Sequence, residues 1–229
     1  MTSTRFVHLV VGIISCTTVA PELSKASVVY SSFVSGTTWQ CCAGIGVSGP
    51  FSSEVQNQEA AAFTPASDYT LAQIDVAFYF NTATPDTNGF ILSLNQDSGG
   101  LPGSVIETWT GLIAPTDGTI GIGNFSSVVE TVSVSAVSVL AGHQYWIVAS
   151  PAASTSLDVW SINTFAGTGP GGITAFNHGS GWVGPEFGTS NDIAFDVRGT
   201  TTPEPGTLML LILSTALIGL GLIGRLRRS

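Results

Sequence analysis

The most constraining feature of this sequence is the alternation of apolar and polar residues in several short segments. A period of two is the period at which the side chains of a β-strand alternate between the two faces of a sheet. The alternation is clearest in Leu71–Phe80 and in Asp192–Arg198. The apolar faces of these two segments are Ile74, Val76, Phe78 and Phe80, and Ile193, Phe195 and Val197, respectively. The pattern predicts strands with one face in a core and the other in water.

The rest of the interior of the chain has the same character. Further strands are predicted at Phe90–Leu94, Ser104–Thr110, Val128–Val134, His143–Ser150 and Leu157–Asn163, and turns at Asn88–Gly89, Ser98–Gly100, Pro102–Gly103, Asp117–Gly118, Ala141–Gly142 and Gly167–Gly172. No interior segment has sustained helical periodicity, which excludes a parallel α/β fold because parallel strands need crossover helices. We therefore predict an all-β domain, an antiparallel β-sandwich or jelly roll.

The charges of the chain are unevenly distributed. The 229 residues carry a net charge of −9. The segment between Ser27 and Thr202 contains thirteen acidic residues and a single basic one, Arg198. A domain with this excess of negative charge is repelled by phosphate groups. Nucleic acid and anionic lipid are therefore not expected partners. A domain with few charges and many Ser, Thr, Gly and Asn residues is typical of exported bacterial β-proteins.

The N-terminal segment Met1–Ala26 has the features of a secretory signal peptide. A single early positive charge, Arg5, precedes an apolar stretch, and the small residues Ser24 and Ala26 follow it. We expect cleavage after Ala26. A competing interpretation takes Ile13–Cys16 as a lipobox, which would leave Cys16 lipidated.

The C-terminal segment combines three features in a fixed order. The triplet Pro203-Glu204-Pro205 is followed by an apolar run, Thr207–Gly224, and then by a basic end, 225–229, with Arg225, Arg227 and Arg228. A helix over the run would measure roughly 27 Å, close to the ~30 Å hydrocarbon core of a bilayer. The arginines resist translocation, so the C-terminus is expected to stay cytoplasmic and the preceding domain to lie outside. An ordinary single-pass anchor is the alternative interpretation.

This order and spacing resemble the PEP-CTERM sorting tail, which exosortases read in Gram-negative bacteria that make extracellular polysaccharide. The resemblance implies a signal peptide at 1–26, an exported domain at 27–199 and a sorting tail at 200–229. It also implies an exosortase partner, transient anchoring in the inner membrane, delivery to the cell surface and an association with exopolysaccharide in biofilms. Glu204 would be the recognised charge, because the two prolines hold the strip around it extended.

A more diffuse similarity extends over most of Ser27–Gly199. The segments Asn57–Tyr69, Leu71–Phe80, Leu92–Trp109 and Gly142–Ser156 resemble the choice-of-anchor R domain. That family is found on exported bacterial proteins with interchangeable C-terminal anchors, and it has no established catalytic residues. The similarity implies an exported surface β-domain and carries no site residues across.

Motifs that would indicate catalysis are absent from the sequence. It has no G-x-S-x-G, HExxH, P-loop or GxGxxG motif, so we expect no enzymatic activity, cofactor or metal. The carboxylates Asp75, Asp192 and Asp196 are expected on solvated strand faces, and Asn95, Asp97 and Asp117 in turns. The neighbours Cys41 and Cys42 are expected to do no catalytic work, and His143 and His178 have no metal-ligand spacing.

Carbohydrate binding is the main alternative function, because flat aromatic rings are platforms on which sugars stack. The candidates are Trp39, Trp109, Trp146, Trp160, Trp182 and Tyr145. Tyr145 and Trp146 are strand neighbours, so they must face opposite sides, and at least one is expected in the core. Trp182 lies in the glycine-rich segment Gly179–Gly184 and is the best candidate for an exposed ring.

Overall fold

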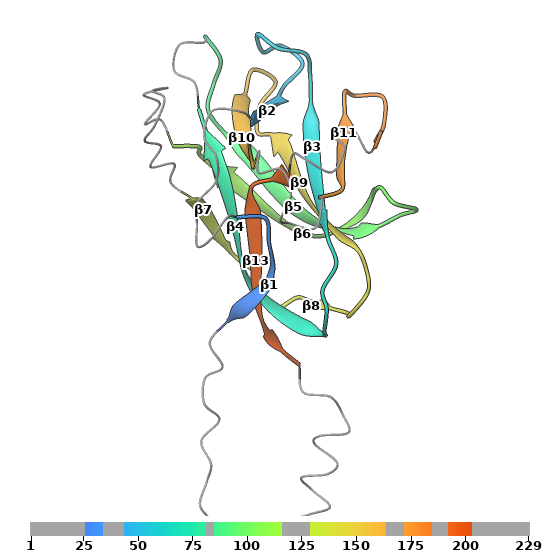
Figure 1. Ribbon diagram of the computed structural model, residues 1–229. Coiled ribbons are helices and arrows are strands. Elements are labelled where there is room, and N and C mark those ends of the chain that lie inside the picture. Colours follow the sequence, from blue (N-terminus) through green and yellow to red (C-terminus); the bar gives the residue numbers. More distant parts are fainter. Residues whose placement is uncertain are drawn as a thin grey trace, which may run out of the picture.

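The computed structural model describes residues 26–33, 44–80, 85–115, 129–163, 172–184 and 192–202, and within these ranges the chain is all β, without helices (Figure 1). The strands are β1 (Ser27–Ser31), β2 (Gly44–Ser48), β3 (Gln58–Phe63), β4 (Tyr69–Tyr79), β5 (Phe90–Asp97), β6 (Pro102–Leu112), β7 (Val129–Ser133), β8 (Ser138–Val139), β9 (Tyr145–Pro151), β10 (Leu157–Asn163), β11 (Thr174–Asn177), β12 (Asp192–Ile193) and β13 (Phe195–Thr201). The predicted all-β class is confirmed.

The strands form two sheets whose strand pairs are all antiparallel. The eight-stranded sheet follows the order β1-β13-β4-β10-β12, with β2 added to β10, and β7 and β8 added to β4. The five-stranded sheet follows the order β11-β3-β9-β5-β6. Strand β4 is central to the larger sheet, because β13 pairs with one of its edges and β7 with the other.

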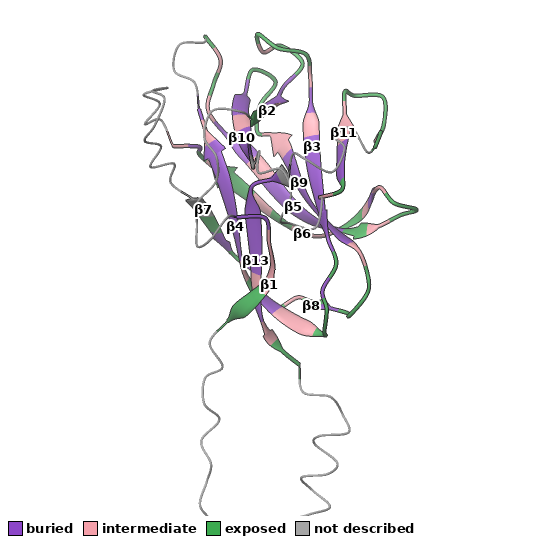
Figure 2. Cartoon of the chain, viewed as in Figure 1, coloured by how far each residue is buried: buried purple, intermediate pink, exposed green. Residues whose placement is uncertain are grey.

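One hydrophobic core lies between the two sheets and contains the apolar faces that the alternation predicted. Ile74, Val76 and Phe78 of β4 are fully buried in it, and Figure 2 shows that burial is concentrated on the central strands. The ring of Phe78 stacks on Phe90 of β5 at a centroid distance of 4.0 Å, and it also contacts Trp160 of β10 at 5.3 Å. These contacts connect the two sheets through aromatic rings.

The five-stranded sheet is apolar on its outer face as well. This outer cluster comprises Ala60, Ala62, Trp146, Val148 and Ala175, with Leu101 and Trp182 packed against it. Alanines on β3 and β11 leave room for the indole of Trp146, which is fully buried. Burial on both faces explains why β3 shows no alternation of apolar and polar residues.

The ends of the domain lie side by side. Strand β1 pairs with β13 in a register that places Ser27 opposite Gly199, and both strands leave the domain at the same end (Figure 1). The turns at 49–56 and 152–156 lie at the opposite end, where the amide of Phe51 donates to the carbonyl of Ser154 at 2.7 Å. We call these the chain-end pole and the distal pole.

Three predicted boundaries are wrong. The segment Asp192–Arg198 is not one strand, because the strand is interrupted at Ala194. The short strand β12 before it pairs with β10, and β13 after it pairs with β4. Strand β13 also continues to Thr201, beyond its predicted end at Arg198. The predicted turn at Pro102–Gly103 is the start of β6, and the turn lies before it, closed by the amide of Ser98 donating to Leu101.

Candidate functional site

The residues predicted to direct export and sorting lie outside the described ranges. They are Pro203, Glu204, Pro205, Arg225, Arg227 and Arg228, and the signal peptide, Cys16, Trp39, Cys41, Cys42 and Asp117 are outside as well. None of the described residues belongs to a helix long and apolar enough to cross a membrane. The predicted helix at 207–224 is not among those residues.

Trp182 does not present the free aromatic ring that was expected. It lies in a loop after β11, as predicted, but its half-buried side chain packs on the outer cluster. Backbone hydrogen bonds of 2.9 Å in both directions between Val183 and Phe176 fold this loop back along β11. Tyr145 and Trp146 face opposite sides, as predicted, and both are buried: Tyr145 in the main core and Trp146 in the outer cluster.

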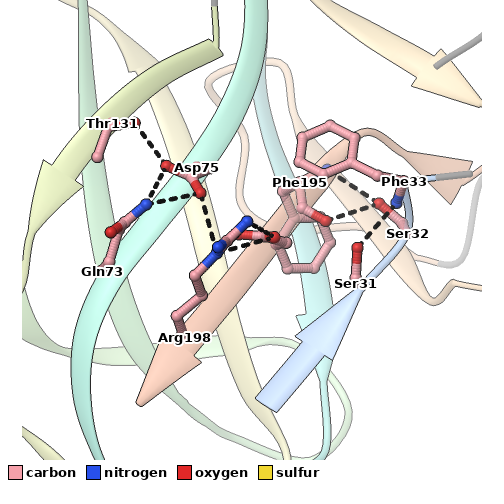
Figure 3. Close-up of polar contacts among 9 residues, drawn as sticks. Ser31, Ser32, Phe33, Gln73, Asp75, Thr131, Phe195 and Arg198 are labelled. Atoms are coloured by element: carbon pink, nitrogen blue, oxygen red, sulfur yellow. Dashed lines mark hydrogen bonds and ion pairs between the residues drawn. The ribbon is translucent and has the colours of Figure 1, made fainter. Parts of the chain in front are cut away.

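Two carboxylates expected on solvated strand faces are buried instead. Asp75 of β4 and Asp196 of β13 stand directly opposite each other in the sheet, and they are 3 % and 2 % exposed. They occupy the outer face of the eight-stranded sheet, where both form ion pairs with Arg198; Figure 3 shows Asp75 and Arg198 of this polar cluster. The alternation predicted the side of the sheet correctly but not its environment. The side chain of Asp192 is outside the described part of the structure.

Arg198 and two neutral side chains satisfy this carboxylate pair. The guanidinium of Arg198 donates to Asp196 Oδ2 from Nη2 at 2.9 Å and forms an ion pair with Asp75 Oδ2 at 3.3 Å. Gln73 Nε2 donates to both oxygens of Asp75 at 2.8 Å, and Thr131 donates to Asp75 Oδ1. The cluster therefore connects β13, β4 and β7 across the centre of the sheet (Figure 3).

The electrostatics of this cluster favour a structural role. Burial raises the pKa of Asp196 to about 6, the neighbouring Asp75 adds to the increase, and Arg198 opposes it. Paired carboxylates with separated pKa values are also found in acid–base catalysis. Here, however, both carboxylates are buried and their oxygens are already taken by neighbouring side chains, so a substrate has no access to them.

A third buried carboxylate, Asp158, lies on β10 near the distal pole. Its side chain is fully buried, its Oδ2 accepts a hydrogen bond from the amide of Gly89 at 2.9 Å, and its Oδ1 has no hydrogen-bond partner. Burial raises the pKa of Asp158 from 3.8 to about 6, against the lowering effect of the Gly89 amide. Ionised Asp158 therefore opposes folding at neutral pH.

This environment predicts a pH dependence of stability. A folded-state pKa above the unfolded value gives stability that is fully present below about pH 4 and is lost as the pH rises through about 6. We expect Asp158 to cost about 1–3 kcal/mol across that window. Asp158→Asn should flatten the curve between pH 4 and 7, measured by urea unfolding at several pH values. Identical slopes in the two proteins would show that Asp158 titrates normally.

A hollow of about 580 Å³ near Asp97 is a further candidate site. It is lined by Gln96, Asp97, Leu140, Gly142, His143, Gln144 and Tyr145. Asp97 Oδ1 already accepts from Trp146 Nε1 at 2.8 Å and Gln144 Nε2 at 2.9 Å, and its Oδ2 accepts from the Gly100 amide at 3.1 Å. Asp97 ends β5 and its carboxylate closes the turn that follows, as predicted, and its oxygens are occupied by the protein. The same prediction was wrong for Asn95, which lies within β5, is paired with β9 and is buried.

Comparisons with known proteins add no relative. No protein-family model matches the sequence, and a search of curated proteins finds no match. Among the described residues, no group of three or more His, Cys, Asp or Glu side chains is placed to hold a metal ion.

Proposed function

We propose that this chain is an exported cell-surface or extracellular-matrix protein that an exosortase sorts through its C-terminal tail. The observation that carries the proposal is the order of the Pro203-Glu204-Pro205 triplet, the apolar run Thr207–Gly224 and the basic end. The apolar run is long enough to stall the chain in the inner membrane. The triplet then lies on the outer side as an extended strip that a processing enzyme can bind.

The arrangement of the domain supports this proposal. Both β1 and β13 leave the domain at the chain-end pole, so a leader and a membrane tail would attach to the same side (Figure 1). The distal pole then faces away from the membrane. We further propose that the two sheets make a β-sandwich. We also propose that this domain has no enzymatic activity, because the carboxylate pair Asp75 and Asp196 is buried and out of reach of a substrate.

Replacing Glu204 tests the sorting proposal. Glu204→Ala should leave membrane insertion intact, because the apolar run is unchanged, but it should trap full-length protein in the inner membrane. Fractionation of the host's inner membrane, outer membrane and medium, followed by immunoblotting, measures both the size and the location of the protein. Asp68→Ala is the control, because it removes an exposed carboxylate of the domain outside the tail and should be sorted like the wild type. If Glu204→Ala changes neither size nor location, the tail is a plain anchor.

A further inference from the structure

A groove of about 520 Å³ lies between β2 and the end of β11. It is lined by Ile45, Gly46, Ser53, Glu54, Val55, Asn57 and His178. We call it the β2–β11 groove. Ile45 and Gly46 belong to β2, Asn57 directly precedes β3, His178 directly follows β11, and the other three residues belong to the turn at the distal pole.

Local geometry holds this groove open. Ser48 and Asn57 exchange backbone hydrogen bonds of 2.9 Å, so the chain between them forms a closed loop. The loop is fixed from outside by Asp86, whose Oδ1 accepts from the amide of Ser53 at 2.8 Å. Gly46 leaves room at the floor, because a Cβ there would lie 2.5 Å from Glu54 Oε2, the end of a flexible side chain that would have to move aside. The carboxylate of Glu54 can therefore lie directly over the β2 backbone.

Asn57 supplies an unused hydrogen-bond acceptor in this groove. Its side chain is 9 % exposed, and its Nδ2 donates to the carbonyl of Gly46 at 2.8 Å and to Glu59 Oε2 at 3.4 Å. These contacts fix the amide orientation, because the flipped amide would turn its oxygen towards two other oxygens. Asn57 Oδ1 has no hydrogen-bond partner and is itself buried, so a ligand reaches it only when a lining side chain such as the exposed Glu54 moves aside. A buried acceptor without a partner costs free energy that a donor on a ligand would recover.

The walls around Asn57 combine polar and apolar chemistry. Glu54 provides a carboxylate, and His178 provides an exposed imidazole, whose ring lies 4.8 Å from that of Phe176. Val55 is 74 % exposed and presents an apolar surface beside them. Hydroxyl groups can donate to Glu54 and, once a lining side chain has moved aside, to Asn57, while the apolar face of a pyranose ring can pack on Val55. Such a mixture of few fixed polar groups and an apolar wall is typical of small-molecule sites.

We propose that the β2–β11 groove binds one unit of a neutral saccharide. The net negative charge of the domain disfavours acidic polysaccharides, because the segment between Ser27 and Thr202 contains thirteen acidic residues and one basic residue. A metal ion fits less well, because the described residues provide no group of three or more ligating side chains. The groove thus replaces Trp182 as the carbohydrate-binding candidate, and it shares the 178–184 loop with that residue.

The orientation of the groove rests on the proposed function, whereas the binding itself does not. A tail at the chain-end pole would hold the groove away from the membrane, where surrounding polysaccharide is accessible. The Glu204→Ala experiment tests the sorting, and a saccharide titration tests the groove. Failure of one therefore leaves the other intact.

Two matched pairs of variants test the groove in the full-length chain. Isothermal titration calorimetry with neutral oligosaccharides of glucose, galactose, mannose and N-acetylglucosamine should find saturable binding. His178→Ala and Val55→Ser should each weaken it about tenfold, as the loss of one hydrogen bond or apolar contact predicts. The controls His143→Ala and Val105→Ser change an exposed histidine and valine elsewhere and should bind as the wild type does. Thermal unfolding checks that all four variants fold.

Several results would overturn the proposal. They are the absence of saturable binding to every oligosaccharide, equal weakening by the groove variants and their controls, and saturation of the groove by calcium chloride or spermidine in place of the saccharide. Retained binding in Trp182→Ala would agree with the proposal, whereas loss of binding only in that variant would return the site to the indole.

Discussion

Arg198→Ala is expected to destabilise the domain by about 3 kcal/mol or more at pH 8. Removing one partner from a buried ion pair leaves uncompensated charge, which typically costs about 3–5 kcal/mol. Here two buried carboxylates, Asp75 and Asp196, would lose their cation. Because the pKa of Asp196 is raised to about 6 in the wild type, protonation should relieve part of the loss. The destabilisation should therefore be smaller at pH 5, measured by urea unfolding at both pH values.

Two variants make this experiment specific. Arg198→Lys retains the charge but not the forked guanidinium geometry, so its loss should be smaller. Adding Asp196→Asn to Arg198→Ala removes one of the stranded charges and should recover part of the stability at pH 8. A loss of unfolding free energy below about 1 kcal/mol for Arg198→Ala at pH 8 would mean that water reaches the two carboxylates and that they are not buried.

Phe78→Ala is expected to cost about 3–5 kcal/mol of unfolding free energy, because it creates a cavity at the contact between the sheets. The Phe78 ring is fully buried and stacks on Phe90 with an interplanar angle of 5°. Truncation removes its contacts with both Phe90 and Trp160, and these neighbours belong to different sheets. Chemical denaturation monitored by tryptophan fluorescence measures the loss.

Phe51→Ala is the matched control for Phe78→Ala. Phe51 is 76 % exposed at the distal pole, and a substitution on the surface should change stability by less than about 0.5 kcal/mol. If both variants lose similar amounts, or if Phe78→Ala loses less than about 1 kcal/mol, the assignment of β4 faces is reversed.

The alternation of residues predicted the strands whose two faces differ in polarity. It identified β4, and the apolar set that includes Ile74 and Phe78 faces the core as expected. It failed for β3, where Gln58–Phe63 is buried on both faces and three consecutive alanines carry no period of two. Alanine also favours helix over strand in isolation, so only tertiary packing under Trp146 decides the conformation of this segment.

The polar sites were less predictable, because they depend on residues far apart in the sequence. Asp75 and Asp196 each alternate with core residues, and nothing local distinguishes a wet carboxylate from one buried beside a partner 121 positions away. The one local clue was Arg198, two residues from Asp196 and the only basic residue between Ser27 and Thr202. Asn57 and His178 come together in the groove only through the pairing of β11 with β3.

We propose that the C-terminal segment is a sorting tail that is removed during delivery. Mass spectrometry of the wild-type protein recovered from the cell surface tests this most directly, because it reads the C-terminus of the delivered chain. If the tail is removed, peptides from the β-domain should be recovered and none from Leu208–Ser229. Recovery of surface protein with its tail intact would contradict it.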